Sequence, residues 1–173
     1  MKTIIATFSL FFAVATSSVV LRSTSRQVSS FDQGIVNRHN FYRAEVGTPP
    51  MTWDATLARD ALAWADFLTT IERLQHDRNR NGQGENILFN TRTNLTPEML
   101  VDQWVTSEKP FFRNGVFPDI STSGDWTDAG HYSQIIWSTT TRVGCGGKRS
   151  PRGRFFYVCR YLAHGNIRGQ RAF

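Results

Sequence analysis

Two histidines and two glutamates have side chains suited to a functional site: His76, Glu85, Glu108 and His131. Each falls at the end of a segment whose pattern predicts a helix or a strand. Two imidazoles are suitable ligands for a borderline divalent ion such as zinc, and nearby carboxylates can fix their tautomers or hold a bound water. Either glutamate could act as a general base on such a water. A lone buried His or Glu is usually a satisfied core group, so the hypothesis requires that the four meet.

His131 opens a segment, residues 130–137, with the sequence GHYSQIIW. Its alternation predicts a half-buried β-strand with His131, Ser133 and Trp137 on one face. Ser133 is the most tempting nucleophile, but residues two apart on a strand are separated by roughly 6–7 Å, too far for a nucleophile to hydrogen-bond a base. We therefore interpret Ser133 as a strand hydroxyl at the rim of the site.

The first expected helix carries another histidine. Ser30 and Gln33 fit a capping box at its start, apolar residues recur at helical spacing, and Gly47 is placed to end it. His39 falls on the apolar, inward-facing stripe of this helix. We expect it to have a structural role, holding backbone or a neighbouring loop, in preference to a catalytic one.

A second helix and a strand position two of the site candidates. The helix should start after Asp54 and fade near Leu74, because apolar residues recur there with a period of 3.6. His76 then lies in the polar loop that follows, which is rich in Asn and Gly. A strand should begin at Glu85.

A third helix should begin at Thr96, an N-cap followed by the proline favoured at the first helical position. Glu108 lies where the two apolar rows of this helix converge, which indicates a buried carboxylate. Fraying of the helix before Pro110 would instead leave Glu108 exposed, and the pattern favours neither outcome.

The loop after this helix, residues 109–126, contains Phe111, Phe112, Phe117 and Trp126 among turn-forming residues. Loops of this length are often functional. The aromatic side chains could form the mouth of a ligand site, or they could pack the loop onto the domain.

The N-terminal residues have the layout of a secretory signal peptide. Lys2 is followed by an uncharged apolar run that is short for a bilayer span, and small residues around Ala15 fit a cleavage site. We predict a signal peptide over residues 1–18, a flexible leader over 19–29 and one domain over 30–173. An uncleaved anchor is the alternative. The mature protein is then expected to be secreted or periplasmic.

Export changes the interpretation of the two cysteines, Cys145 and Cys159. In an oxidising compartment they are expected to pair. A turn signal at Pro151 lies between two strand-like runs, which would bring the sulfur atoms together across a hairpin. A disulfide that closes a loop of this size stabilises a fold by about 3 kcal/mol in the chain-entropy model. A metal or redox pair would be expected to show the CxxC spacing, which this chain lacks.

The formal net charge is +6, and the positive charge is concentrated towards the C-terminus. From Arg142 onwards there are eight Lys or Arg and no Asp or Glu. This pattern fits contact with an anionic surface such as lipid headgroups or cell-wall polymers, but a solvated basic face is the simpler explanation. No nucleic-acid-binding motif is present, so we expect no nucleic acid as a partner, and we expect a monomer.

Six ordered stretches together resemble the CAP superfamily of cysteine-rich secretory proteins, antigen 5 and pathogenesis-related 1 proteins, also called the SCP domain. In chain order they are HNFYR at residues 39–43, PPMTWD at 49–54, GENI at 84–87, GHYSQIIW at 130–137, VGCG at 143–146 and YVCRY at 157–161. Six matches in the right order are far more specific than any single motif. The sparse cysteines and the loop after Glu108 look most like bacterial members.

This resemblance implies an α+β fold, a three-layer α/β/α sandwich with a central antiparallel sheet between helices. It also implies a cleft lined by His76, Glu85, Glu108 and His131. A divalent ion such as Zn²⁺ would bind between the two histidines, and the two glutamates would be the candidate catalytic groups.

Three functions fit these observations. The first is a secreted, non-catalytic binding module for a lipid-like or other amphipathic ligand, which we favour because no credible nucleophile accompanies the histidines. The second is a metal-dependent hydrolase of the peptidase kind that uses the His/Glu cleft. The third is an interaction protein that contacts a cell surface through its basic C-terminal region.

Overall fold

The computed structural model describes residues 28–173. Its α-helices are α1 (Ser30–Glu45), α2 (Ala55–Ile71), α3 (Pro97–Glu108) and α4 (Gly130–Ile136), with 3-10 turns at Lys109–Phe111 and Trp126–Asp128. Its strands are β1 (Thr52–Trp53), β2 (Gly84–Asn90), β3 (Arg142–Arg149) and β4 (Phe155–Leu162). The predicted signal peptide, residues 1–18, and all but the end of the leader lie outside the described residues. Within the described range, no helix combines the length and apolar character needed to span a membrane.

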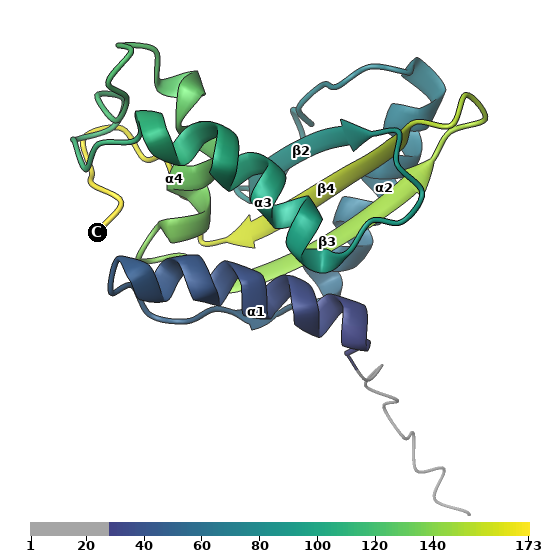
Figure 1. Ribbon diagram of the computed structural model, residues 1–173, viewed down its shortest axis with the longest axis horizontal. Helices are drawn as coiled ribbons and strands as arrows, with labels where there is room; N and C mark the ends of the chain where they lie inside the picture. Colours follow the sequence, from purple (N-terminus) through teal and green to yellow (C-terminus); the bar gives the residue numbers. More distant parts are fainter. Residues whose placement is uncertain (1–27) are drawn as a thin grey trace, which may run out of the picture.

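The strands form one sheet in the order β1-β3-β4-β2, with helices on both faces (Figure 1). One face is covered by α2, which packs on β3 and β4, and the other by α1, α3 and α4, which contact one another. The β2–β4 and β4–β3 pairs are antiparallel, and the two-residue β1 runs parallel to β3. The predicted α/β/α sandwich is therefore confirmed, with this short parallel strand added at one edge.

Two apolar cores lie on the two faces of the sheet because successive side chains of a strand point in opposite directions. In β4, Phe156 and Val158 pack against α2 residues such as Ala61. Tyr157 and Tyr161 belong to the larger core formed with α1, α3 and α4. Any charged residue in the middle of β4 therefore points into one of two buried layers.

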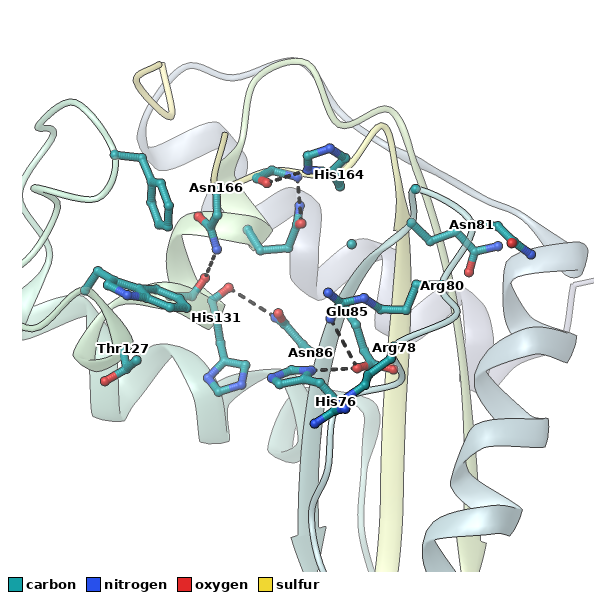
Figure 2. A pocket seen from close by; sticks show the side chains of 18 residues that line it. His76, Arg78, Arg80, Asn81, Glu85, Asn86, Thr127, His131, His164 and Asn166 are labelled. Carbon is teal, nitrogen blue, oxygen red and sulfur yellow. Dashed lines mark hydrogen bonds and ion pairs between the residues drawn. The ribbon is translucent and has the colours of Figure 1, made fainter. Parts of the chain in front are cut away.

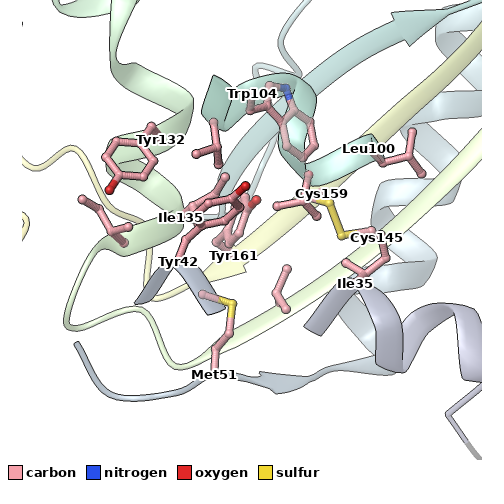
Figure 3. Packing of buried hydrophobic residues seen from close by; sticks show 14 of the residues in the cluster. Ile35, Tyr42, Met51, Leu100, Trp104, Tyr132, Ile135, Cys145, Cys159 and Tyr161 are labelled. Carbon is pink, nitrogen blue, oxygen red and sulfur yellow. A yellow bond between two sulfur atoms is a disulfide. The ribbon is translucent and has the colours of Figure 1, made fainter. Parts of the chain in front are cut away.

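The disulfide joins the two central strands inside the larger core. Cys145 and Cys159 are direct partners in the β3–β4 register, and their sulfur atoms are bonded. Figure 3 shows the bond close to Leu100 of α3 and Ile35 of α1. The turn that closes this hairpin contains Gly153 with φ of 80°, a conformation that glycine adopts at little cost. The predicted hairpin and its disulfide are both present.

The helix ends differ from the predicted ones by a few residues. Ser29 caps α1, since its hydroxyl accepts a hydrogen bond from the Asp32 amide, so the prediction of Ser30 was wrong by one residue. The second helix ends at Ile71 and not near Leu74, because Glu72 adopts a left-handed conformation with φ of 53°. Local patterns locate helices better than they locate their last turns.

The prediction of a strand over residues 130–137 was wrong, because Gly130–Ile136 form helix α4. Except for His131, every residue of this helix is buried, including Tyr132 and Gln134. A segment buried on all sides has no polar face to reveal a helical period, so apparent alternation carries little information. The face shared by His131 and Ser133 in the predicted strand does not exist.

Candidate functional site

A cavity of about 620 Å³ lies at one end of the sheet, beside the first residues of the edge strand β2 (Figure 2). It is surrounded by the loop between α2 and β2, by the chain around the start of α4, and by the segment after β4. His76, Glu85 and His131 are among the residues that line it, whereas Glu108 pairs with His131 and does not line the cavity. The tertiary structure thus brings the four predicted residues to one place, as two His–Glu pairs.

The first pair is His76 with Glu85. Glu85 Oε1 lies 2.6 Å from His76 Nδ1 and accepts a 3.1 Å hydrogen bond from the Asp77 amide. The Glu85 side chain is fully buried, while that of His76 is half exposed. The β2–β4 register places Glu85 opposite Arg160, whose Nη2 lies 3.1 Å from Glu85 Oε2. A buried carboxylate is tolerated here because a buried guanidinium accompanies it.

The second pair is His131 with Glu108. Glu108 is the last residue of α3 and is buried, so the alternative in which the helix end frays and exposes it is excluded. Its Oε1 pairs with His131 Nδ1, and its Oε2 accepts a 2.9 Å hydrogen bond from the Tyr132 amide. The carboxylate therefore satisfies an amide in the first turn of α4, where a helix favours negative charge. The His131 ring stacks on Trp104 of α3, with centroids 6.0 Å apart.

Arg43 fixes the other end of α4. Its guanidinium is buried and donates hydrogen bonds of 2.8 Å to the carbonyl oxygens of Ile135, Trp137 and Thr140. Burial lowers the pKa of Arg43 to about 10, with a smaller opposing effect from Tyr161. The side chain still carries its charge at neutral pH, beside carbonyl groups that would otherwise lack partners.

His39 is completely buried and does not line the cavity. Its Nδ1 lies 2.9 Å from the carbonyl oxygen of Ile35, which can only accept, so Nδ1 carries the proton. Its Nε2 then accepts from the Tyr161 hydroxyl at 2.9 Å. Burial and the nearby Arg43 lower the pKa of His39 to about 4, although the bond to Ile35 acts in the opposite direction. His39 is thus a neutral group that ties α1 to β4.

Both histidines of the cavity use the same ring nitrogen for their carboxylate. In His76 and His131 the Nδ1 atom faces a glutamate, and Nε2 makes no hydrogen bond within residues 28–173. A carboxylate on one ring nitrogen is the arrangement that orients a histidine for metal binding through the other. In Figure 2 both rings lie towards the lower end of the view, and His164, which also lines the cavity, lies at the upper end.

The fit of a divalent ion to these residues is limited. The two Nε2 atoms are suitable ligands, but the described residues contain no cluster of three or more His, Cys, Asp or Glu that could hold a metal. Both glutamates are already engaged with histidines and backbone amides. A structural zinc site uses four protein ligands and a catalytic site usually three. Any metal ion bound through these histidines would therefore need water or a ligand to complete its coordination.

Sequence reasoning missed Arg160, which the structure places between Glu85 and Asp77. Its Nη2 donates to Asp77 Oδ2 at 2.8 Å. Burial alone would raise the pKa of Asp77, but the hydrogen bonds from Arg160 and the Asn79 amide bring it below its usual value. A signal was present: Arg160 continues the alternating row of Phe156 and Val158, so it had to be buried.

Two amides of the recognised motifs also had no predicted role. Asn86 donates through Nδ2 to the carbonyl oxygen of His131 at 3.1 Å, which links β2 to α4. Gln134 accepts a 2.7 Å hydrogen bond from the Gly165 amide, which holds the segment after β4 against α4. Both residues line the cavity and maintain its shape.

The aromatic loop packs onto the domain with one part and lines the cavity with another. Phe117 and Trp126 line the cavity, and their rings are in an edge-to-face arrangement with centroids 5.3 Å apart. Phe112 packs edge-to-face on Tyr132 of α4. One part of the loop is therefore anchored in the domain, while another forms a wall of the cavity.

The profile of the CAP family, described as the cysteine-rich secretory protein family, matches residues 36–161. The chain belongs to the CAP family. Among relatives of this CAP protein, pathogenesis-related protein 1C of Nicotiana tabacum is 33% identical over 164 residues, covering 94% of this chain and 93% of its own. The PR-1 type pathogenesis-related protein of Sambucus nigra is 34% identical over 141 residues, covering 82% of this chain and 81% of its own.

These relatives are plant proteins, so the predicted likeness to bacterial members is not supported, and neither is a periplasmic location. The small number of cysteines was therefore a misleading criterion.

Solved structures agree on the fold of this CAP protein. A crystal structure of NaASP2 with Zn²⁺ superimposes with a TM-score of 0.66 at 21% identity, covering 86% of this chain and 88% of that chain. The crystal structure of Hookworm Platelet Inhibitor gives a TM-score of 0.62 at 17% identity, covering 86% of this chain and 78% of that chain. At these identities the comparison concerns the fold alone.

Proposed function

We propose that this CAP protein is secreted and binds, without chemical turnover, an amphipathic ligand with an anionic head group. The observation that supports this is the mixed lining of the cavity. The aromatic rings of Phe117 and Trp126 come from the segment between α3 and α4. The guanidinium groups of Arg78 and Arg80 come from the loop before β2. Ligand sites commonly combine an apolar wall with a few polar groups that fix orientation.

The lining argues against a hydrolytic nucleophile. Among the described residues around the cavity, the one hydroxyl group belongs to Thr127, and there is no cysteine. Ser133 is completely buried and does not line the cavity. Each glutamate already accepts a backbone amide in addition to its histidine, so neither is an unencumbered base. Binding is therefore the activity that the site supports best.

A divalent ion could take part in this binding. His76 and His131 would hold it through their Nε2 atoms, with Glu85 and Glu108 orienting the rings. When bound, such an ion would supply a positive charge for the head group of the ligand. The NaASP2 structure, whose fold is similar, was determined with Zn²⁺.

The proposal can be tested with decyl phosphate, a single-chain anionic amphiphile, by isothermal titration calorimetry. We expect saturable binding to the wild type. Trp126→Ala should weaken it roughly fivefold, because truncation of an aromatic contact residue typically costs about 1 kcal/mol.

Phe111→Ala is the matched control, since Phe111 lies in the same loop and is 44% exposed, against 42% for Trp126, but does not line the cavity. This control should bind like the wild type. Unchanged affinity in Trp126→Ala would overturn the proposal. So would turnover of ester or peptide substrates that disappears in Glu85→Gln.

A further inference from the structure

Asparagine followed by glycine occurs twice in the chain, at Asn81-Gly82 and at Asn114-Gly115, and arginine precedes both pairs. Such a pair can react without an enzyme, because glycine has no side chain to keep its amide nitrogen away from the asparagine side chain. The two pairs have the same neighbours on the side of the asparagine. In the folded protein they differ in hydrogen bonding and in the space around them.

Asn81 and Gly82 are the two central residues of an exposed turn in the loop before β2. The Gln83 amide donates to the carbonyl oxygen of Arg80 at 2.9 Å, and φ is 51° at Asn81 and 75° at Gly82. Positive φ at both central positions is characteristic of a type I′ turn, which Asn-Gly favours. Within residues 28–173, neither the Gly82 amide nor the Asn81 side chain makes a hydrogen bond. A Cβ atom on Gly82 would meet no atom within 4 Å, so this peptide has room to rotate.

Asn114 and Gly115 are fixed by contacts on both sides. The Gly115 amide donates to the carbonyl oxygen of Arg113 at 2.8 Å. Asn114 donates through Nδ2 to the main-chain oxygen of Phe173 at 3.0 Å. A Cβ atom on Gly115 would overlap the carbonyl oxygen of Asp119, so the backbone there has no room to turn. The nitrogen that would attack is therefore engaged, and the side chain that it would attack is bonded elsewhere.

The reaction available to the first pair is deamidation. The backbone nitrogen of Gly82 attacks Cγ of Asn81 and loses its proton to solvent as the new C–N bond forms. The bond between Cγ and Nδ2 breaks, and Nδ2 leaves with the electron pair as ammonia. Water then opens the cyclic imide at one of its two carbonyl carbons and leaves aspartate or isoaspartate. One water is consumed for each ammonia released, and a neutral amide becomes a negative charge.

The location of Asn81 gives this change of charge a consequence. Asn81 lines the larger cavity and directly follows Arg80, and Arg78 lines the same cavity. Figure 2 shows Arg80 and Asn81 on the side of the view away from His131. A carboxylate at position 81 would offset part of the positive charge with which these guanidinium groups attract anions.

We propose that Asn81 deamidates spontaneously in the folded protein, that Asn114 is protected, and that the new carboxylate weakens the binding of anionic ligands in the larger cavity. The charge of the cavity wall therefore changes with the age of the protein. The first part of the proposal depends on the chain alone. The effect on ligands rests on the proposed function, the binding of an anionic amphiphile.

The first part is tested by incubating the folded protein in mildly alkaline buffer and digesting samples with pepsin in acid, where imide formation is slow. Peptide mass spectrometry detects the replacement of NH₂ by OH at each asparagine. Asn81 should convert roughly tenfold faster than Asn114 or more, because Asn114 and Gly115 must first lose their hydrogen bonds. In denaturant, which removes these contacts, the two should convert at similar rates. Equal rates in the folded protein, or no conversion of Asn81, would overturn the proposal.

The effect on ligands is tested with Asn81→Asp, which carries the charge of the product from the start. In isothermal titration calorimetry it should bind decyl phosphate roughly threefold more weakly than the wild type, since the added charge acts through water. Asn37→Asp is the matched control, because Asn37 is exposed on α1 and does not line the cavity, and the net charge changes equally. It should bind like the wild type.

Equal affinity in the wild type and both variants would overturn the effect on ligands. If the wild type itself did not bind decyl phosphate, the proposed function and this effect would both be overturned. The peptide masses would still decide on their own whether Asn81 deamidates.

Discussion

At the level of single residues, the contacts of each histidine determine its role. His39 has both ring nitrogens satisfied inside the core, whereas His76 and His131 each leave Nε2 without a hydrogen-bond partner in residues 28–173. The two carboxylates also differ in their surroundings. Glu85 pairs with the buried Arg160, whereas Glu108 accepts a hydrogen bond from an amide in the first turn of α4. The helical spacing already favoured a structural role for His39, but only the contacts show that His76 and His131 each pair with a glutamate.

The low pKa of His39 predicts a loss of stability in mild acid. Its value falls from 6.5 to about 4 on folding, mainly through burial, so between these pH values the unfolded chain binds a proton that the folded chain does not. The free energy of unfolding should therefore decrease as the pH falls from 6.5 to about 4, by about 3 kcal/mol from this group.

His39→Gln removes the titrating group and keeps an amide able to donate to Ile35. Thermal melts across this pH range should show a flatter decline for His39→Gln than for the wild type. If both proteins lose the same stability, another group is responsible for the acid sensitivity.

At the scale of elements, the close contact of α2 with the sheet depends on glycines of β3. A Cβ atom on Gly144 would overlap the backbone nitrogen of Ala58 and the carbonyl oxygen of Asp54. Gly146 faces the backbone of Leu62 in the same way. The two glycines of the VGCG motif thus let α2 lie directly on β3, while the cysteine between them faces the opposite core.

Gly144→Ala should destabilise the protein by about 1–3 kcal/mol, since the clash is with backbone and α2 must move as a unit. Chemical denaturation measures this directly. Lys148→Ala on the same strand is the control, because its side chain is 55% exposed and its loss should change stability by less than about 0.5 kcal/mol. If Gly144→Ala left the free energy of unfolding unchanged, α2 would have to lie further from β3 than the structure shows.

At the scale of the whole molecule, the cavity joins the two helical layers. His76 follows α2, which covers one face of the sheet, and His131 begins α4, which packs on the other. The edge strand β2 brings them together, because Glu85 pairs with His76 and Asn86 donates to the carbonyl of His131. A ligand or ion held by both histidines would connect the layers.

Zinc should therefore raise the melting temperature if both histidines bind it. Binding to the native state alone adds about 2.7 kcal/mol when the free ion is at about 100 times its Kd. Differential scanning fluorimetry should show the shift in the wild type and in His164→Ala, whose histidine lines the same cavity. The shift should vanish in the double variant His76→Ala with His131→Ala. A shift that persists there would place the ion at another site.

The layered fold, three of the four α-helices, the β3–β4 hairpin with its disulfide and the residue types of the site can all be predicted from the amino-acid sequence. Helices with one buried face and strands with turn signals leave a periodic record, and six ordered motifs identify the family. Three features became visible in the folded chain and not before: residues 130–136 form a helix, Glu108 is buried, and Arg160 lies beside Glu85. These features depend on contacts between segments that are far apart in the chain. The periodic rows that contain Glu108 and Arg160 indicate burial but do not identify the partner of either charge, and α4 is buried except at His131, so it has no polar face to reveal its helical period.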